Sequence, residues 1–580
     1  MRNFLLNNFV ILAQMFCMRI LGFFLLFLTS VFSQNKYPKD YFGSPLDISL
    51  SIAGSFGELR PNHFHTGIDF RTKQKEGFPV YATADGFISR INIATYGYGK
   101  CIYIDHPNGF TTVYAHLQSL APAVHKLVNE TQYAQQSYTV EIRPNANVLP
   151  VKKGELIGYS GNTGGSSGPH LHFEVRDTKS EYAINPFFFG YDEKVKDTKA
   201  PIVNGLLVYP IGEDSSVNGS ENPLNVPLSL QKDGSYLAGK VEGKGKIGFG
   251  LNAHDISDFN YGKNGIFKAD VYLNGMPHYG YEFDSFSFDE MHHINCFIDY
   301  PRYKQTHQRF QKLFVGSIYP INIVKLMRND GIVNLALNFT LNYKIVLQDF
   351  HGNKTIINVP ISYKNTPITQ PVKEIKTPYF LKARNDNSYA KDDISVFFPE
   401  NTFYDDFYLK FEVSNNELLL HSESIAVNNP FQITFDVSKI PVAEREKMFI
   451  ANLDGTRTEY NSTFKKEDVF SIRTKKLGKF FLKKDDVIPR IFNPNFKEGD
   501  TLDVQKNIKI SIMDDLSGIK EYNAYLNGKW ILMEYETKLN RLTHDFSDDK
   551  FENGRNDFKI EVKDNMGNIA AFESHFYKTK

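Results

Sequence analysis

Short strand-like runs joined by tight turns are the feature that most limits what this chain can fold into. In its first third, runs rich in β-branched and aromatic residues occur at residues 80–82, 86–91, 101–104 and 110–116. Turns rich in glycine and asparagine separate them, and consecutive strands with short connections pair antiparallel. The runs therefore predict an antiparallel meander. Because the chain has 49 phenylalanines and 32 tyrosines but no Ala-rich helical block, we expect an all-β protein.

Two histidines stand two residues apart in a strand-like stretch at 168–174. In an extended chain His170 and His172 would point to one face, about 6 to 7 Å apart. Two imidazoles on one face suggest a metal site in which one is a ligand and the other is free to act on what the metal holds. His65 and Asp69 would complete a nitrogen, nitrogen and oxygen set. Zinc accepts such a set, and three protein ligands leave a position for water, as in catalytic sites.

A third candidate imidazole ends the run at 110–116. Tyr114 and His116 lie two residues apart, so we expect them to share the face from which a sheet could present His116 to the metal. The glycine-rich loop at 161–168 lacks the Gly-Lys-Ser/Thr ending of a phosphate-binding loop. We expect its glycines to let two backbone segments approach each other beside the site.

Five motifs in order extend this pattern, at residues 65–69, 79–86, 114–117, 154–158 and 168–174. Together they resemble the lysostaphin-type (LytM-type) zinc metalloendopeptidases, which are cell-wall hydrolases built on a small antiparallel β-sheet. The resemblance covers residues 56–176, about a fifth of the chain. It implies a zinc-dependent metalloendopeptidase that hydrolyses peptide bonds in the stems or cross-links of peptidoglycan, with a zinc-bound water as nucleophile.

The resemblance also implies roles for the site residues. His65, Asp69 and His172 would bind one Zn2+ per chain. His116 and His170 would act on the bound water and the developing oxyanion, and the sequence leaves open which does which. Two alternatives from other classes remain: a catalytically silent envelope protein that binds or activates a cell-wall hydrolase, and an adhesion or scaffold protein that acts through its C-terminal domains.

Three acidic residues near the motifs are further candidates. Glu174 lies two residues after His172 on the same predicted face, where it would either support that histidine or be solvated. Asp85 and Asp105 lie in predicted turns, so we assign them to turn structure rather than to catalysis. No His-Glu-x-x-His sequence occurs, which excludes the ordinary zincin peptidases as a template.

Residues 123–149 form an insertion that is longer than the family needs between its third and fourth motifs. The segment is polar and could overhang the groove. Substrate choice or self-inhibition would then differ from the family.

The rest of the chain repeats one β design. The segments 249–255, 271–275 and 343–353 recur in the same order as 510–515, 524–528 and 558–568, with Asn-Gly and Gly-Asn turns in matching places. This predicts two immunoglobulin-like (Ig-like) β-sandwiches with a third β module between them. The expected domains are a signal peptide (1–33, with Met18 as an alternative start), a zinc peptidase domain (37–195), an Ig-like β-sandwich (200–365), a β-sandwich module (376–485) and a C-terminal Ig-like β-sandwich (486–580).

Residues 20–32 form an apolar run of thirteen, which is short for a membrane span but typical of a signal peptide. We therefore expect export to the periplasm, cell envelope or exterior, with no stable transmembrane span after signal removal. Sixty-six basic and sixty-six acidic residues give no net charge, so nucleic-acid binding is not favoured. The expected partners are peptidoglycan peptides and an envelope protein bound through the C-terminal modules.

A second conceivable metal cluster lies in an extra stretch at 285–330. It contains His292, His293 and Cys296, but adjacent histidines on a strand point to opposite faces, so we do not expect it to bind metal. Cys101 and Cys296 are too few for a disulfide scaffold, and we expect Cys101 to be a core residue.

Overall fold

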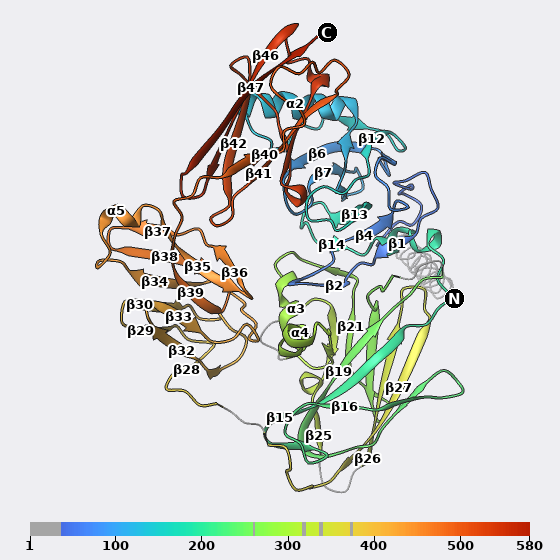
Figure 1. The fold of residues 1–580 in the computed structure, drawn as a ribbon. Coiled ribbons are helices and arrows are strands. Elements are labelled where there is room, and N and C mark those ends of the chain that lie inside the picture. The colour runs from blue at the N-terminus through green and yellow to red at the C-terminus, as the bar shows by residue number, and fades with distance from the viewer. Residues whose placement is uncertain (1–35, 259–261, 316–320, 336–339, 372–374, 580) are drawn as a thin grey trace, which may run out of the picture.

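The computed structural model describes residues 36–258, 262–315, 321–335, 340–371 and 375–579. Within them the chain forms mostly antiparallel sheets around four large hydrophobic cores, and the all-β prediction is confirmed. We refer to the surrounding residues as the first (36–200), second (201–371), third (375–485) and fourth (486–579) units. The units are arranged in a ring, so that the red C-terminal strands return to the blue first unit (Figure 1).

One sheet of the first unit carries the site. Its strands, in spatial order, are β1 (Ile52–Gly54), β4 (Ile68–Arg71), β13 (His170–Asp177), β8 (Phe110–Ala115), β7 (Lys100–Asp105), β6 (Gly86–Ile93) and β10 (Val140–Ile142). β6, β7 and β8 form the predicted antiparallel meander. The run at 80–82 is not part of it, because β5 (Pro79–Tyr81) pairs with β12 (Leu156–Tyr159) in a small sheet with β9 (Ser119–Leu120).

Alternation along β13 gives this sheet its two faces. The side chains buried in the core are Leu171, Phe173 and Val175. The side chains on the opposite face are His170, His172, Glu174 and Arg176. A slip of one residue would turn Glu174 and Arg176 into the apolar core, so the cost of burying charge there fixes the register that places the histidines.

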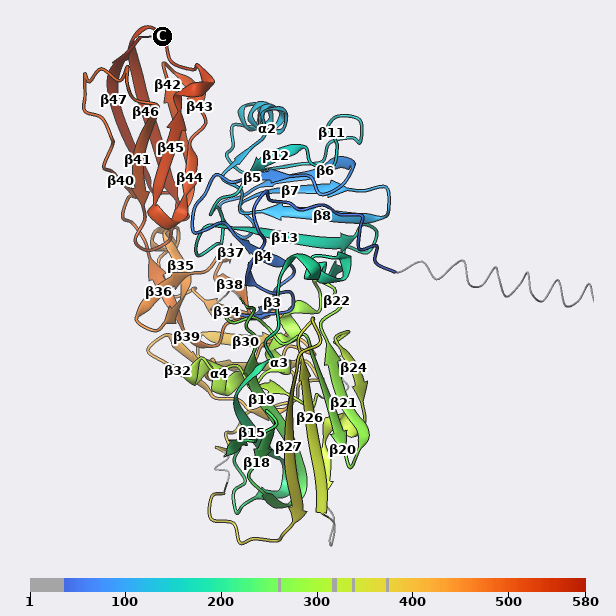
Figure 2. The same cartoon turned by 90° about the vertical axis from the view of Figure 1, so that its right-hand side faces the viewer.

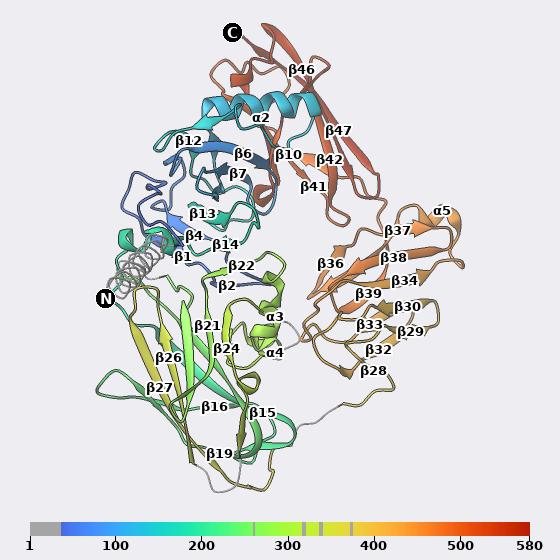
Figure 3. The same ribbon diagram turned by 180° about the vertical axis from the view of Figure 1, so that it is seen from behind.

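The predicted insertion contains a helix, α2 (Pro122–Gln135), which the strand pattern did not predict. Proline fits the first turn of a helix because no backbone donor is needed there, and Gln136 ends the helix in the left-handed conformation. Figures 2 and 3 show α2 beside the fourth unit. There the ring of Tyr133 meets that of Trp530 edge-on, with centroids 5.4 Å apart, and its hydroxyl donates to Asp548. The insertion therefore docks the fourth unit instead of overhanging the groove.

The second unit is joined to the first by more than a linker. Its main strands, in spatial order, are β16 (Leu224–Val226), β15 (Ile202–Val217), β19 (Val241–His254), β27 (Lys354–Tyr363), β26 (Thr340–Gln348), β20 (Lys268–Leu273), β21 (Met276–Glu282) and β24 (Val324–Met327). β14 (Ala183–Ile184) of the first unit pairs with β22 (Ser285–Phe286) of the second. Phe56 and Phe64 of the first unit are buried in the core of the second. Two short helices, α3 (Ile294–Phe297) and α4 (Tyr300–Thr306), lie near this junction (Figure 1).

The third and fourth units are each built mainly from two sheets, and the third also contains a small sheet of β28 (Phe380–Leu381) and β31 (Phe407–Tyr408). One large sheet of the third unit contains, in spatial order, β29 (Asn387–Lys391), β30 (Ile394–Phe398), β34 (Phe431–Asp436), β38 (Val469–Thr474) and β37 (Phe464–Lys466). The other contains β32 (Phe411–Ser414), β33 (Glu417–Leu420), β39 (Gly478–Lys484), β35 (Met448–Asp454) and β36 (Arg457–Tyr460). One sheet of the fourth unit contains β40 (Arg490–Phe492), β41 (Asn507–Met513), β45 (Arg541–Asp545) and β44 (Glu534–Glu536). The other contains β43 (Lys529–Ile531), β42 (Ile519–Leu526), β46 (Gly554–Asp564) and β47 (Ile569–Lys578). The ion pair of Lys100 with Glu534, at 2.8 Å, helps to close the ring.

The predicted repeat is visible in matching hairpins of the second and fourth units. The turns Asn274-Gly275 and Asn527-Gly528 both have positive φ at both residues, as a type I′ turn requires. In each turn the asparagine backbone N–H donates to a residue of a neighbouring strand and its Oδ1 accepts from that same residue, all at 2.8 Å.

The signal peptide predicted at 1–33 lies outside the described residues. Within the described part of the chain, no helix is long and apolar enough to cross a membrane.

Candidate metal centre

Asp69 and His172 face each other across two neighbouring strands. They are directly opposite in the antiparallel pairing of β4 with β13, so their side chains lie on the same face. Asp69 Oδ1 is 2.9 Å from His172 Nδ1. The sheet register alone produces this contact between residues about a hundred positions apart.

His65 reaches the same point from the loop after β3 (His63–Phe64). Its Nε2 lies 3.1 Å from Asp69 Oδ1 and 3.1 Å from His172 Nδ1. Gly67 makes this approach possible, because a Cβ there would lie 2.3 Å from a backbone carbonyl oxygen of β13. All three side chains of the cluster are buried.

These three side chains could hold a metal ion. One ligand atom from each lies within 4.8 Å of the others. Their separations of 2.9 to 3.1 Å are close to the edge of about 3.3 Å of a tetrahedron whose corners lie about 2.0 Å from a zinc ion. Two nitrogens and one oxygen are donors that zinc accepts, and three ligands leave a fourth position. The residues present therefore fit the metal that the sequence predicts.

Two more histidines border this cluster. Nε2 of His170 lies 3.3 Å from Asp69 Oδ1. The ring of His116 is centred 4.9 Å from that of His170 and 5.8 Å from that of His172. All five side chains predicted as site residues thus come together in the structure.

His116 reaches the site by a route that the sequence pattern did not predict. β8 ends one residue before it, and His116 itself has a left-handed backbone with φ of 60°. Tyr114 is opposite Phe173 and packs against it in the core, with ring centroids 5.4 Å apart. The expectation that Tyr114 and His116 share one face is therefore wrong, because the left-handed residue breaks the alternation of the strand. Histidine adopts this conformation more readily than most residues.

The ring nitrogens that face away from the cluster are each held by a hydrogen bond. The donors and acceptors are His65 Nδ1 and the Ser55 carbonyl (2.8 Å), His116 Nδ1 and the Thr163 carbonyl (2.9 Å), His170 Nδ1 and the Gly168 carbonyl (2.8 Å), and His172 Nε2 and the Glu174 carboxylate (2.7 Å). We assign the tautomers from these contacts, which leave the other nitrogen of each ring to the cluster.

The glycine-rich loop at 161–168 supplies two of these carbonyls. The Gly165 N–H donates to the Gly97 carbonyl at 2.7 Å. Gly164 has φ of 70°, and a Cβ there would lie 2.3 Å from the Gly99 nitrogen. The predicted close approach of two backbone segments beside the site is confirmed.

Glu174 is fully buried beneath His172 and supports it. Its carboxylate accepts bonds from His172, Thr66 and Tyr98, and one of 2.6 Å from Arg176 Nε. Nη2 of Arg176 forms an ion pair with the same carboxylate, also at 2.6 Å. Burial opposes ionisation, but Arg176 and His172 outweigh it and hold the pKa of Glu174 well below its usual range. Of the two alternatives that the sequence left open, a solvated Glu174 is therefore wrong.

These contacts also set the charges of the histidines. Burial acts to lower the pKa of His172, but the bonds to Asp69 and Glu174 raise it overall to about 9. Burial, together with the nearby His172 and His170, lowers the pKa of His116 to about 3. Without metal, His172 is therefore an imidazolium at neutral pH while His116 is a neutral imidazole.

Three residues of the site were not predicted. Arg60 donates to Asp69 Oδ2 at 2.8 Å, which leaves Oδ1 to the histidines. Tyr98 and Arg176 both donate to Glu174. Arg176 could have been found, because it continues the two-residue alternation of β13. Arg60 and Tyr98 have no periodic signal that would place them at the site.

An open groove of about 1080 Å³ runs over the cluster. Its walls include Arg60 and Arg71 of the first unit and Met291 and Arg309 of the second, whereas no described residue of the 123–149 insertion lines it. The second unit therefore forms one wall of the site.

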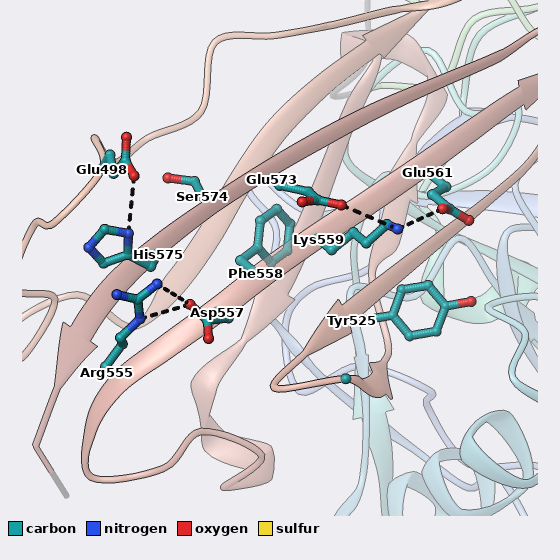
Figure 4. A pocket seen from close by; sticks show the side chains of 11 residues that line it. Glu498, Tyr525, Arg555, Asp557, Phe558, Lys559, Glu561, Glu573, Ser574 and His575 are labelled. Carbon is teal, nitrogen blue, oxygen red and sulfur yellow. Dashed lines mark hydrogen bonds and ion pairs between the residues drawn. The ribbon is translucent and has the colours of Figure 1, made fainter.

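A separate hollow of about 730 Å³ lies on the β46–β47 sheet of the fourth unit (Figure 4). The ion pairs drawn there are Lys559 with Glu561 and Glu573, Arg555 with Asp557, and His575 with Glu498. Because each of these charged side chains is paired with another, we assign no site to this hollow.

The residues His292, His293 and Cys296 do not lie on a strand. Met291–His293 form a short 3-10 turn that leads into α3, and the two imidazole rings lie side by side with centroids 4.2 Å apart. The reason given for dismissing a metal site there was therefore wrong. His292 Nε2 instead bonds Asn428 Oδ1 of the third unit at 2.9 Å.

The strands and the cluster agree with the expected resemblance to the lysostaphin-type peptidases. Residues 63–134 and 124–186 match the profile of Peptidase family M23, and residues 378–485 match that of the Zu5-like domain. The first match covers about a fifth of the chain and contains the cluster, and the second covers another fifth, in the third unit.

Named relatives resemble the same part of the chain. DD-carboxypeptidase/endopeptidase Mpg of Neisseria meningitidis serogroup B is 39% identical over 112 residues, which are 19% of this chain and 20% of the relative. Peptidoglycan DD-endopeptidase ShyA of Vibrio cholerae is 33% identical over 137 residues, 23% and 26% of the two chains. The solved catalytic domain of lysostaphin from Staphylococcus simulans is 27% identical, with a TM-score of 0.18; the match covers 24% of this chain and 89% of that domain. The chain spans about a fifth to a quarter of the length of these two curated relatives.

Proposed function

We propose that the protein is a zinc-dependent metalloendopeptidase that cuts peptide bonds in the stems or cross-links of peptidoglycan. The observation that carries this proposal is the convergence of five side chains, distant in sequence, at the floor of an open groove. The match to a peptidase family supports hydrolysis of a peptide bond. Relatives named peptidoglycan DD-endopeptidases support the substrate class.

His65, Asp69 and His172 would hold one zinc ion per chain. When bound, zinc supplies a Lewis acid that allows water to ionise near neutral pH and polarises the substrate carbonyl. The chain's own part is to present His65 Nε2, Asp69 Oδ1 and His172 Nδ1 in fixed directions. Hydrogen bonds on the far side of each ligand hold these directions.

The hydrogen bonds of His116 and His170 support a division of their roles. His116 donates its Nδ1–H to a carbonyl and is neutral, so its Nε2 is free to accept the proton of the attacking water. His170 also donates its Nδ1–H to a carbonyl, but its Nε2 lies 3.3 Å from the Asp69 carboxylate. We therefore assign to His170 the other role, in which it faces the oxygen of the tetrahedral intermediate.

Two arginines of the groove support a substrate that carries carboxylates. Arg71 of the first unit and Arg309 of the second both line it. A guanidinium group binds a carboxylate with two parallel hydrogen bonds. We therefore propose that an acidic peptide lies along the groove, held between the two units.

We further propose that the protein acts outside the cytoplasm, because its apolar run at 20–32 is typical of a signal peptide. The β units would position the peptidase domain at the cell wall or bind an envelope partner.

Mass spectrometry of peptidoglycan fragments tests the function. After incubation with the zinc-loaded protein we expect new peptide amino and carboxyl ends. The His116→Asn variant should not produce them, and the control His125→Asn, an exposed histidine of α2, should. A protein that binds zinc but leaves peptidoglycan intact would support the alternative of a silent envelope protein. Cleavage of glycan strands alone would contradict the proposed reaction.

A further inference from the structure

A group of acidic side chains lies at the junction of the first and second units, away from the metal centre. Asp197 comes from the last residues of the first unit; we call this segment, and the corresponding end of the third unit, a linker. Asp255 directly follows β19, and Asp349 directly follows β26. All three line a cavity of about 30 Å³ together with Asn264. Such a volume is enough for a water molecule or a single ion.

Within the described residues, two polar side chains of this cavity have atoms without a hydrogen-bond partner. Asp255 is 5% exposed, and its Oδ1 has no hydrogen-bond partner. Asn264 is 4% exposed, and neither its Oδ1 nor its Nδ2 has one. Unpaired polar atoms that are buried to this extent are costly, so they point to a missing ligand.

The fourth unit carries a corresponding group at its junction with the third. Asp485 comes from the linker, Asp514 directly follows β41, and Asp564 ends β46. One oxygen from each lies within 4.8 Å of the others. Ser517 is 2% exposed, and its hydroxyl has no partner among the described residues, although its N–H donates to Asp485.

The two groups share a hydrogen-bond framework. Asn353 and Asn568 each donate their backbone N–H (2.9 and 2.8 Å) and their Nδ2–H (both 2.7 Å) to the aspartate four residues earlier. The same Nδ2 also donates to the carbonyl of the linker aspartate, at 3.3 Å for Asp197 and 3.1 Å for Asp485. The framework thus ties each linker to its unit in the same way twice.

The carboxylates are not neutralised by the described residues around them. The lysines next to the two linker aspartates pair elsewhere, Lys196 with Asp258 and Lys484 with Asp486. Within the described part of the chain, none of the six aspartates forms an ion pair with lysine or arginine. Three carboxylates at one junction therefore call for a cation.

The donor set identifies the kind of cation. His351 lies close to Asp197 and Asp349, but methionine occupies its place in the fourth unit, so the donors common to both groups are all oxygens. Two oxygens that each lie about 2.4 Å from one ion can be at most about 4.8 Å apart. The carboxylate oxygens of the second group lie within this distance of one another. Calcium prefers oxygen donors, including carboxylates and neutral oxygens, at this distance.

We propose that the two groups are calcium sites, with one ion each, and that each ion fastens its unit to the preceding one. At the junction of the first and second units the ligands would be Asp197, Asp255, Asp349 and Oδ1 of Asn264. At the junction of the third and fourth units they would be Asp485, Asp514, Asp564 and the Ser517 hydroxyl. The first cavity is also lined by Ser55, whose carbonyl holds His65, so calcium there would steady the support of that histidine. The proposal does not depend on peptidase activity.

Equilibrium dialysis of the full chain tests the proposal. The protein is freed of metals, reloaded with one equivalent of zinc and dialysed against about 10 mM Ca2+, which is at least about tenfold above the dissociation constants typical of extracellular modules. Elemental analysis should find two calcium ions per chain. Asp349→Asn and Asp564→Asn should each bind one. The exposed control variants Asp233→Asn and Asp549→Asn, in the same two units, should bind two.

The wild-type protein alone can overturn the proposal, whether or not the variants fold. No calcium bound at this concentration would refute it. So would two ions retained in both Asp349→Asn and Asp564→Asn, or equal affinity for Mg2+. We also expect calcium to raise the melting temperature of the wild-type protein, and no rise would contradict the fastening of the units.

Discussion

Replacing Glu174 by glutamine tests whether the charge beneath the metal centre matters more than its shape. Glutamine keeps the size of the side chain but removes the charge that faces both His172 and Arg176. The Arg176 side chain is 5% exposed, so the change leaves a buried guanidinium without its counter-charge. Breaking a buried pair in this way costs about 3 to 5 kcal/mol. We expect β13 to become less stable by that amount.

Zinc binding should weaken as well. The Nε2–H of His172 loses its charged acceptor, so the orientation and basicity of the ring are less well held. Loss of such a partner lowers metal affinity about 10- to 100-fold, which corresponds to about 1.4 to 2.7 kcal/mol.

Glu181→Gln is the matched control. Glu181 lies 3.8 Å from the same guanidinium but is 59% exposed, and exposed pairs contribute about 0 to 1 kcal/mol. Hydrogen exchange of β13 peptides measures the free energy of opening, and competition with a chromophoric chelator measures the zinc dissociation constant. We expect both to change strongly in Glu174→Gln and little in Glu181→Gln. If the two variants behave alike, the argument from the buried charge is refuted.

Four further predictions concern the histidines of the site and the contact of α2 with the fourth unit. His172→Ala should lose both zinc and peptidase activity. His116→Asn should keep zinc and lose activity by about 100-fold or more, because asparagine tolerates the left-handed backbone but cannot accept the proton. The zinc content and turnover of the two variants test this, and an active His116→Asn variant would show the assigned role of His116 to be wrong. Zinc binding should displace about one proton between pH 6.5 and 9, because metal-free His172 has its pKa raised to about 9; calorimetry in buffers of different ionisation enthalpy measures the proton, and its absence would contradict the raised pKa. The same shift stabilises the metal-free protein fully below pH 6.5, and this contribution is lost as pH rises through 9, so unfolding midpoints without metal should fall over that window. Tyr133→Ala should shift the emission of Trp530, the sole tryptophan, to longer wavelengths because its indole loses the covering ring; unchanged fluorescence would count against docking of α2 on the fourth unit.

Much of the site could be predicted because it depends on local sequence patterns, namely strand alternation and turns. The alternation of β13 places His170 and His172 on one face, and the turns around β6, β7 and β8 indicate the meander. The same alternation contained Arg176, which was overlooked. His116 was predicted as a site residue for a reason that proved wrong, since its left-handed backbone leaves no periodic trace. The domain boundaries and the roles of the five residues stay predictions.

The sequence by itself determined the strands, the turns and the types of side chain offered to a metal, because these depend on neighbours along the chain. Only the tertiary structure decided which distant residues meet. The β4–β13 register pairs Asp69 with His172, Arg60 reaches Asp69 from a loop, and α2 packs on the fourth unit instead of covering the groove. These contacts depend on how sheets and units pack together. Packing is determined by burial and hydrogen bonding between segments far apart in sequence, and the local periodicity of the sequence contains no information about such contacts.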